Sequence, residues 1–383
     1  MSPEEQRQGR LVATLEERGM AALIVTAPAN VRYLTGYVGS NGIAVIGSDG
    51  RRLLTDSRYA VSARAEARGV EVAIGKRDLL GDVAAAVAEI APGGTVAVEA
   101  EHLTLARHER LRAALDGREL APTSALVEDL RVEKDPGEVA AIRAAAAMAD
   151  AALAAVLAEG LAGRTEREVA FAIQGALLDA GAEEPSFPVI VAAGPHGARP
   201  HAVPTGEPIP EGTLVVVDQG AVHRGYCSDM TRTLATGPLP EELERAYAVC
   251  LEAQEAALAA VRPGLAAAEL DDVARSVIVE AGLGESFGHG LGHGVGLEIH
   301  ERPTVRPEGA ETLRPGMVVT IEPGIYLEGL AGVRIEDLVL VTEDGGEALS
   351  RSPKELQTIS RGGSAPSNPR RSMGGRPASP SDP

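Results

Sequence analysis

Short apolar runs alternate with amphipathic stretches from residue 4 to about residue 125. Three of these runs have the length and composition of buried strands: AALIVT (21–26), GIAVIG (42–47) and TVAVEA (95–100). Helix-like stretches separate them. This alternation predicts an α/β layer domain.

A more charged segment, LVEDLRVEKDPGEV, follows at residues 126–139. Asp135-Pro136 within it is a good helix start, because proline suits the first helical position. We therefore place the domain boundary near residues 126–134 and expect one domain over residues 1–128 and a second over residues 129–360.

The second region shows the periodicity of helices and of strands. It opens with a long Ala-rich helix, and further helices are predicted near residues 165–181, 240–261 and 267–282. Strands are predicted at TLVVVD (213–218), MVVTIE (317–322) and VRIEDLVLV (333–341). An α/β (α+β) fold is expected for the whole chain.

Part of this region resembles another part of it. In both places a helix ends in Ala-Gly and is followed shortly by Ser-Phe, at residues 180–187 and at residues 281–287. The pattern hints at two duplicated halves, each with a helix followed by strands.

No stretch predicts a membrane span. Residues 140–159 are the most apolar, but Arg143, Asp150 and Glu159 interrupt them as they would in a soluble amphipathic helix. Residues 361–383 are rich in Ser, Gly and Pro and are predicted to be a disordered tail. We expect a cytoplasmic protein.

Charge and cysteine content exclude two classes of partner or site. The formal net charge is -19 and no dense run of Lys and Arg occurs, so nucleic acid is not an expected partner. Only Cys227 and Cys250 are present, which gives neither a disulfide framework nor a structural zinc cluster.

Two aspartates stand at strand-like runs. Asp218 ends LVVVD, and Asp229 begins DMTRTLA eleven positions later. A hairpin would bring both carboxylates to one place. A carboxylate beside a buried strand is costly unless it faces a cation, donors or water. Taken alone, both residues could instead cap turns.

Histidines gather in the glycine-rich segment FGHGLGHGVGLEIHE, residues 287–301. His289, His293 and His300 are three of the eight histidines in the protein. The glycines argue against a helix and let the backbone approach a bound group closely. The segment is therefore a candidate for ligand or metal binding.

Two glutamates complete the set. Glu322 closes MVVTIE before Pro323-Gly324 turns the chain, and Glu336 lies in VRIEDLVLV. Strand alternation puts Arg334 on the same face as Glu336, where it can orient or partly neutralise the carboxylates. Singly, these glutamates could be solubilising residues at strand edges.

Four carboxylates and one imidazole suit two divalent ions, most of all Mn²⁺, with Co²⁺ and Zn²⁺ as alternatives. Four negative charges balance two such ions. A water shared by the two ions would be hydroxide at neutral pH, which favours hydrolysis of an amide.

The ordered motifs VVVDQG, SDMTRT, HGLGHGVGLEIHE, TIEPGIY and GVRIED resemble those of the pita-bread metallopeptidases, specifically Xaa-Pro dipeptidases (prolidases) and aminopeptidase P. YLTGYVGSNG (33–42) and LLTDSRY (53–59) resemble their creatinase-type amino-terminal domain. The resemblance implies a pseudo-twofold pita-bread catalytic domain, a homodimer, and a small peptide substrate with proline at the second position.

The same resemblance implies roles for individual residues. It implies that the metal ligands are Asp218, Asp229, His293, Glu322 and Glu336. Asp229 and Glu336 would bridge the two ions. It also implies that Glu322 takes a proton from the bridging water. His201 and His300 would stabilise the tetrahedral intermediate beside the substrate. His289 either helps form the substrate pocket or makes a structural hydrogen bond.

One departure bears on substrate length. Thr304 follows Pro303, where some prolidases have an arginine, and Thr304 cannot form an ion pair with the carboxylate of a dipeptide. Arg302 lies on the other side of the proline. The sequence therefore leaves open whether the substrate is a dipeptide or a longer peptide. Two other functions are alternatives: a creatinase-like amidinohydrolase and a non-catalytic binding protein.

Overall fold

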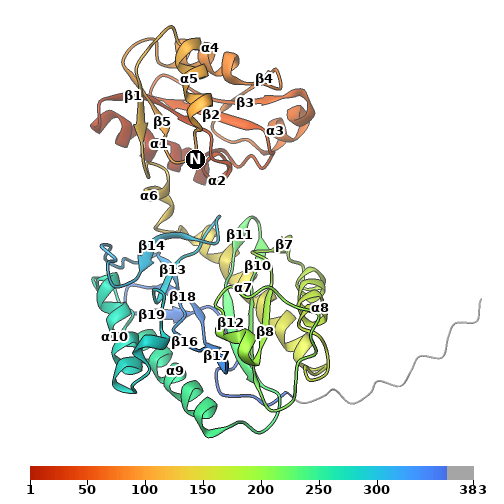
Figure 1. The fold of residues 1–383 in the computed structure, drawn as a ribbon. Coiled ribbons are helices and arrows are strands. Elements are labelled where there is room, and N and C mark those ends of the chain that lie inside the picture. Colours follow the sequence, from red (N-terminus) through yellow and green to blue (C-terminus); the bar gives the residue numbers. More distant parts are fainter. Residues whose placement is uncertain (360–383) are drawn as a thin grey trace, which may run out of the picture.

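The structure is a computed structural model and describes residues 1–359. The tail expected at residues 361–383 lies outside the described residues. Figure 1 shows two units joined by the short helix α6 (Glu128–Arg131).

The first unit is a six-stranded mixed sheet in the order β4-β3-β2-β1-β5-β6. Its strands are β1 (Met20–Val25), β2 (Gly42–Gly47), β3 (Arg51–Asp56), β4 (Glu71–Gly75), β5 (Thr95–Glu99) and β6 (Leu120–Thr123). Its helices are α1 (Pro3–Glu17), α2 (Pro28–Thr35), η1 (Ser57–Tyr59), α3 (Ala60–Glu66), α4 (Leu80–Ile90) and α5 (Leu105–Ala114).

Both faces of this sheet are buried. In β1, Ala22 and Ile24 pack with residues of α4, whereas Leu23 and Val25 pack with residues of α1 and α2. The near-continuous apolar runs in the sequence reflect this burial on both sides, because neither parity of side chain faces water. The predicted α/β layer domain is confirmed.

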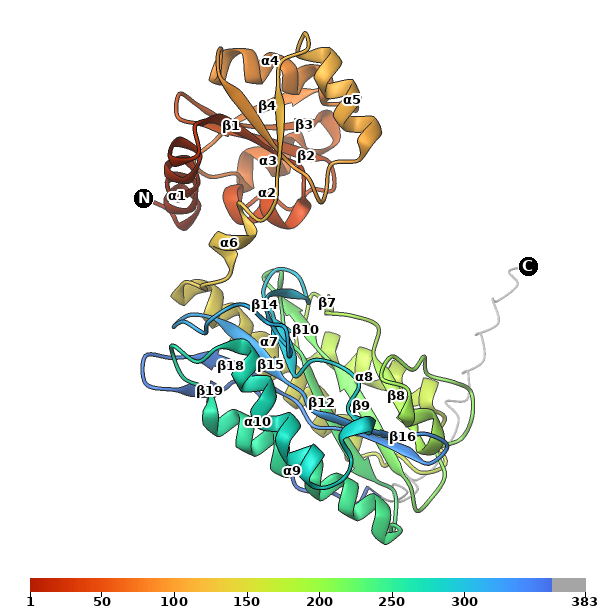
Figure 2. The same ribbon diagram turned by 60° about the vertical axis from the view of Figure 1, so that its left-hand side comes forward.

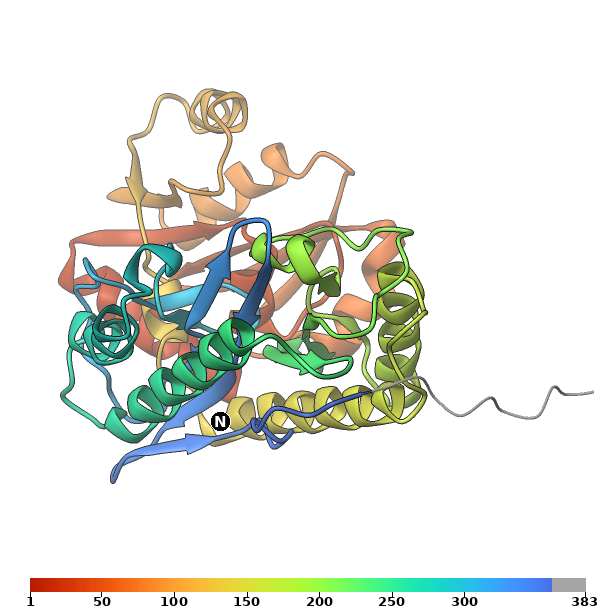
Figure 3. The same ribbon diagram turned by 60° about the horizontal axis from the view of Figure 1, so that its bottom comes forward.

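The second unit is built from two similar halves, which confirms the predicted duplication. One half has α7 (Pro136–Leu157) and α8 (Glu166–Asp179) beside the sheet of β8 (Ile190–Ala193), β9 (Leu214–Gln219) and β12 (Met230–Ala235). The other has α9 (Glu241–Ala260) and α10 (Ala267–Glu280) beside the sheet of β13 (Gly292–Gly294), β14 (Glu301–Val305), β15 (Val318–Ile321), β18 (Asp337–Val341) and β19 (Gly346–Ala348). Figure 2 shows α9 and α10 together on one flank, and Figure 3 shows the four helices around the strands.

Smaller elements complete the second unit. They are β7 (Glu184–Pro185), β10 (Ala221–His223), β11 (Tyr226–Cys227), the hairpin β16 (Gly324–Leu327) and β17 (Ala331–Arg334), and the short helices η2 (Gly194–Ala198) and η3 (Gly284–Ser286).

Helix α7 begins where the sequence predicts. The Asp135 side chain accepts from the backbone N–H of Glu138, and the Glu138 side chain accepts from the backbone N–H of Asp135, with Pro136 between them. By length and composition alone α7 could cross a membrane. It packs instead inside the second unit, where Arg143 pairs with Glu347 and Asp150 accepts from the backbone of residue 351.

The predicted strand over residues 333–341 is wrong in one respect, because the chain forms two strands there. Arg334 pairs with Gly324 in the β16–β17 hairpin, whereas Asp337 pairs with Ile321 in the five-stranded sheet. Between them, the backbone N–H of Glu336 donates to the carbonyl of Thr231 in β12. The break lets this segment change partners, and periodicity alone does not reveal such a change.

Charged contacts tie the two units together. Arg131 is buried and donates to Asn30 Oδ1 (2.7 Å) in the first unit and to Glu298 Oε2 (2.8 Å) in the second. It also pairs with Glu301, whose other oxygen lies 3.1 Å from Lys134 Nζ. Burial alone would raise the pKa of Glu301, but these two cations outweigh burial and lower it.

We expect Glu301→Gln to lower the free energy of unfolding by about 3 to 5 kcal/mol at pH 7, because it leaves two buried cations short of a partner. A depressed carboxyl pKa contributes its full stability above the ordinary glutamate value of 4.5, and this contribution is lost progressively as the pH falls from that value through the lower pKa of the folded state. The difference between the two proteins should therefore shrink as the pH falls below that value. Urea denaturation at pH 7 and pH 4 measures both effects. Glu308→Gln, at an exposed residue, is the matched control, and equal losses in the two variants would contradict the expectation.

Candidate metal centre

The first carboxylate is positioned by strand alternation in β9. Val215 and Val217 are buried among residues of α7 and α8. Successive strand residues point to opposite faces, so Asp218 points away from these helices and toward the second half of the unit. β12 pairs antiparallel with β9 and begins one residue after Asp229. Both aspartates therefore reach the space between the halves.

The second half presents its acids in the same way. Val319 and Ile321 of β15 pack in the core with α9 and α10, which turns the alternate positions, Thr320 and Glu322, toward the same space. Residues 333 and 335 are also buried in that core, and the alternate residues Arg334 and Glu336 line the cavity. The predicted sharing of a face by Arg334 and Glu336 holds despite the strand break.

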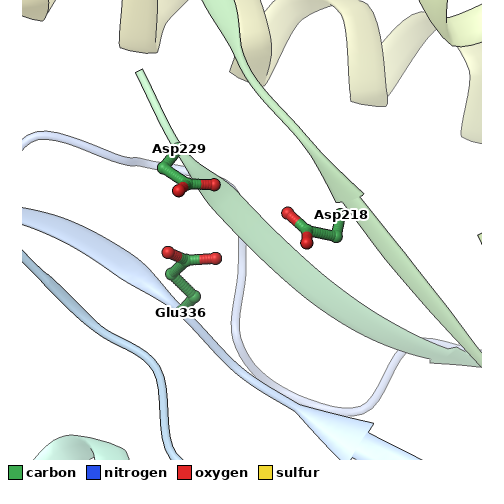
Figure 4. A group of neighbouring side chains, drawn as sticks. All are labelled: Asp218, Asp229 and Glu336. Carbon is green, nitrogen blue, oxygen red and sulfur yellow. The ribbon is translucent and has the colours of Figure 1, made fainter. Parts of the chain in front are cut away.

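Three carboxylates converge in the space between the halves. Asp218, Asp229 and Glu336 each offer an oxygen, and these oxygens all lie within 4.8 Å of one another. Figure 4 shows the three side chains pointing toward one another from β9, from the residue before β12 and from the segment between β17 and β18. Such a group could hold a metal ion.

His293 and Glu322 join this cluster from β13 and from the end of β15. His293 Nε2 lies 3.3 Å from Glu322 Oε1 and 3.7 Å from Asp229 Oδ2. The other ring nitrogen, Nδ1, lies 3.0 Å from the carbonyl oxygen of Gly294 and must donate to it, since a carbonyl only accepts. Nε2 is thereby directed at the carboxylates, as it would be in a metal ligand.

The cluster carries more negative charge than its protein neighbours balance. Burial, and then neighbouring carboxylates, raises the pKa of Asp229 and of Glu336 well above the usual range. Burial also raises the pKa of Asp218. Asp218 Oδ1 and Glu336 Oε1 are buried and have no hydrogen-bond partner among the described residues. Hard oxygen ligands with unmet acceptors fit divalent cations.

Glu322 behaves differently from the other acids. Burial alone would raise its pKa, but the hydrogen bond and the charge of His293 outweigh burial and lower the pKa to about 2. The same contact raises the pKa of His293 against the effect of its burial. A cation at Nε2 would take the place of the proton that the carboxylates draw onto this ring.

Neutral and cationic side chains hold the acids in place. Arg334 donates to Asp218 Oδ2 (2.6 Å) and to Thr231 Oγ1 (3.0 Å), and Thr231 in turn donates to Glu336 Oε2 (2.8 Å). Thr320 Oγ1 donates to Glu322 Oε1 (3.0 Å) and accepts from the backbone N–H of His293. Sequence reasoning singled out Arg334 but neither threonine. Thr231 lies two residues after Asp229, and Thr320 lies two residues before Glu322. Because residues two apart in a strand share a face, this spacing could have identified both threonines.

Tyr326 also escaped sequence reasoning, although it lies in the motif TIEPGIY. Its hydroxyl accepts from Arg334 (2.9 Å) and lies 3.0 Å from Nε2 of His289. His289 Nδ1 donates to the carbonyl of Gly290, so Nε2 must accept from the tyrosine. His289 thus makes the structural hydrogen bond that was one of its two predicted roles, and it also lines the cavity.

The cluster opens into a cavity of about 480 Å³. His201 and His300 both line it, and the His300 ring packs edge-on against His293 with centroids 4.4 Å apart. Burial, and then the charge of His293, lowers the pKa of His300, so this imidazole is neutral at pH 7. Phe187, Pro188 and Ile190 form an apolar part of the wall. The cavity thus brings together the carboxylate cluster, His293 and two further imidazoles.

The sequence model of metallopeptidase family M24 matches residues 140–343, and that of the creatinase/prolidase amino-terminal domain matches residues 7–132. The chain belongs to metallopeptidase family M24. The resemblance inferred from the motifs is therefore confirmed. The M24 assignment also makes the protein a metallopeptidase that uses divalent metal ions.

Known members of the family match over nearly the whole chain. The Xaa-Pro dipeptidase of Pyrococcus furiosus is 36% identical over 92% of this chain and 99% of its own length. A solved Xaa-Pro dipeptidase from Bacillus anthracis superposes with a TM-score of 0.90 at 38% identity, covering 93% of this chain and all of the other. An X-Pro aminopeptidase structure from Thermotoga maritima gives a TM-score of 0.85 at 35% identity, covering 92% of this chain and all of the other. These matches confirm the pita-bread fold.

Replacing Asp229 by Asn should affect the metal-free and the metal-loaded protein in opposite directions. A carboxyl whose pKa is raised on folding opposes folding above its unfolded pKa, so the variant should be more stable than the wild type in excess EDTA at pH 7. Mn²⁺ at a hundredfold excess over its Kd should stabilise the wild type by about 2.7 kcal/mol, and the variant much less.

Thermal unfolding with EDTA and with Mn²⁺ tests this expectation without an activity assay. Asp272→Asn removes an exposed aspartate and should change neither measurement. An Asp229→Asn protein with the full Mn²⁺ effect would show that Asp229 is not needed to hold the ion.

Proposed function

We propose that this chain is a two-metal peptidase that hydrolyses the bond before proline when proline is the second residue of a dipeptide or short peptide. The observation that carries the proposal is the group of carboxylates from both halves, with His293 and Glu322 beside it, at the base of one cavity. The names of the similar proteins, Xaa-Pro dipeptidase and X-Pro aminopeptidase, support the specificity for proline.

In this proposal the metal ligands are the five residues that the sequence predicts, with Asp229 and Glu336 shared by both ions. The sharing is supported by two contacts: Asp229 lies close both to Asp218 and to His293, and Glu336 lies in the same group as the two aspartates. The ligand set favours Mn²⁺, with Co²⁺ and Zn²⁺ as alternatives. When bound, the ions would lower the pKa of the attacking water and polarise the scissile carbonyl.

Side chains of this chain supply the proton transfer and the orientation. Glu322, with its lowered pKa, is ionised at neutral pH and accepts the proton of the attacking water. His201 and His300, which both line the cavity, donate hydrogen bonds to the oxygen of the tetrahedral intermediate. Arg334 fixes Asp218, and His289 completes the wall beside it.

Three further proposals concern the protein as a whole. Buried, unbridged thiols at Cys227 and Cys250 support a cytoplasmic location. The family resemblance supports a homodimer. The matched ranges support division into residues 1–128 and 129–360. A creatinase-like amidinohydrolase or a non-catalytic binding protein fits less well, because the full set of carboxylates is retained.

The direct test is an assay of the purified protein with Mn²⁺ against Ala-Pro, Ala-Pro-Ala and creatine, together with measurement of bound metal. We expect cleavage of a proline peptide that depends on the metal, and none of creatine. A metal-loaded protein that cleaves neither proline peptide would overturn the proposed function.

Two substitutions separate metal binding from catalysis. Glu336→Ala should lose bound metal and activity together, because it removes a shared ligand. His300→Ala should keep both ions and lower kcat by roughly 100-fold or more, as expected for loss of one oxyanion donor. Metal analysis beside steady-state kinetics distinguishes the two. Loss of both metals in His300→Ala would show that His300 supports the metal site instead.

A further inference from the structure

One buried carboxylate outside the metal centre holds the segment that carries His201. Glu166 begins α8, and only 3% of the residue is exposed. The segment, residues 193–205, is called the His201 loop below, and it places His201 on the wall of the cavity. Glu166 Oε1 accepts from the backbone N–H of Ala193 (2.8 Å), and Oε2 accepts from the backbone N–H (2.9 Å) and the hydroxyl (2.8 Å) of Thr205. One side chain thus fixes the loop both before and after the histidine.

A further contact to Glu166 comes from inside the loop. His196 Nδ1 lies 3.0 Å from Oε1 and 2.9 Å from Oε2 of this carboxylate. Burial alone would raise the pKa of Glu166, but the hydrogen bonds from Ala193, Thr205 and His196 outweigh burial and lower it. The carboxylate is therefore ionised at pH 7 and only accepts, so His196 donates to it through Nδ1. Four donors of the loop meet this one acid.

The His201 imidazole depends on its backbone for its position. Its side chain is exposed, and it forms no hydrogen bond or ion pair with residues 1–359. The carbonyl of the preceding residue, Pro200, accepts from Arg334 Nη1 (3.2 Å). The place of the imidazole in the cavity is therefore set by the groups that hold the backbone of the loop.

Close backbone packing also seats the loop beside the metal centre. A Cβ at Gly197 would lie 3.1 Å from the carbonyl oxygen of Ala192 and 3.3 Å from the backbone nitrogen of Gly332 in β17. A Cβ at Gly332 would in turn clash with the carbonyl of Gly197. Glycine at both positions lets η2 approach β17, the strand that ends at Arg334. The loop thus has two kinds of support, this packing on β17 and the carboxylate of Glu166.

The other half of the unit holds a histidine segment in a comparable way. Asp271 of α10 is buried, and its Oδ1 accepts from the backbone N–H of Leu291 (2.9 Å). Arg275 pairs with this aspartate and donates to the carbonyls of Phe287 (3.1 Å) and His289 (2.8 Å). In each half, an acid of the second helix therefore binds the backbone of a segment that brings a histidine to the cavity.

We propose that Glu166 is a positioning residue for the reaction: by holding both ends of the His201 loop, it keeps the imidazole where it can donate to the tetrahedral intermediate. This inference rests on the proposed function, because it concerns an oxyanion donor named there. Glu166 does not line the cavity, so it acts through His201 and not on substrate or metal. Its contribution should therefore appear in kcat, and only while His201 is present.

The test is a double-mutant cycle of Glu166→Gln and His201→Ala, measured with the Mn²⁺-loaded protein on the proline peptide that the wild type cleaves best. A glutamine keeps one acceptor oxygen and turns an amide NH₂ toward the donors of the loop, so the loop should loosen. Glu166→Gln should lower kcat roughly 10-fold, within the roughly 100-fold loss expected for His201→Ala, and change KM and bound Mn²⁺ less than about twofold. In the His201→Ala background it should lower kcat less than about twofold.

Two further variants complete the design. Glu207→Gln makes the same chemical change at an exposed glutamate two residues after Thr205, and its kcat should equal that of the wild type. Thr205→Val removes the hydroxyl donor and keeps the backbone N–H, so it probes the same contact if Glu166→Gln does not fold. Its smaller loss of kcat should also vanish in the His201→Ala background. Thermal unfolding and bound-metal content report that each variant is folded and loaded.

Three outcomes would overturn the inference. They are an unchanged kcat in Glu166→Gln, the same loss of kcat from Glu166→Gln with and without His201, and an unchanged kcat in His201→Ala. Failure of the wild type to cleave any proline peptide would instead overturn the proposed function itself.

Discussion

Four carboxylates line one cavity, and they cannot all be ionised there without positive charge from elsewhere. The protein provides a little of that charge through Arg334, and the carboxylates draw a proton onto His293. The pKa values of Asp229 and Glu336 stay raised because this positive charge does not balance the four carboxylates. A group so arranged is costly to fold and is useful when cations complete it.

The pita-bread architecture is what makes this crowding feasible. Each half buries one parity of its strand residues under its own helix pair, and the other parity faces the opposite half. Apolar residues therefore stabilise each half separately, and the polar residues left over meet at the centre. Hydrogen bonds from Thr231 and Thr320 fix the carboxylates without adding charge. The arrangement keeps the acceptors rigid and leaves some of their oxygens free for cations.

Polar chains extend from this centre to the substrate side. Asp218, Arg334, Tyr326 and His289 form one continuous series of hydrogen bonds, which connects a carboxylate of the first half to the wall of the cavity. On the opposite side, Glu301 follows His300 directly and is clamped by Arg131 and Lys134 from the connection between the units. The connection between the units thereby helps to fix the loop that carries His300, which lines the cavity of the carboxylate cluster.

The sequence by itself determined the parts that depend on local patterns. Alternation and turn residues predicted most of the helices and strands, the duplicated halves, and all five residues that the structure gathers into one cluster, because strand parity and the position of a turn are set within a few residues. Tertiary structure alone decided which partners those residues meet. Arg334 lies 116 positions from Asp218, and Arg302 lies 173 positions from Asp129. The same long-range packing divided the predicted strand at residues 335–336 and paired Arg302 with Glu311 and Asp129. A side chain's partners depend on segments that the local pattern does not contain.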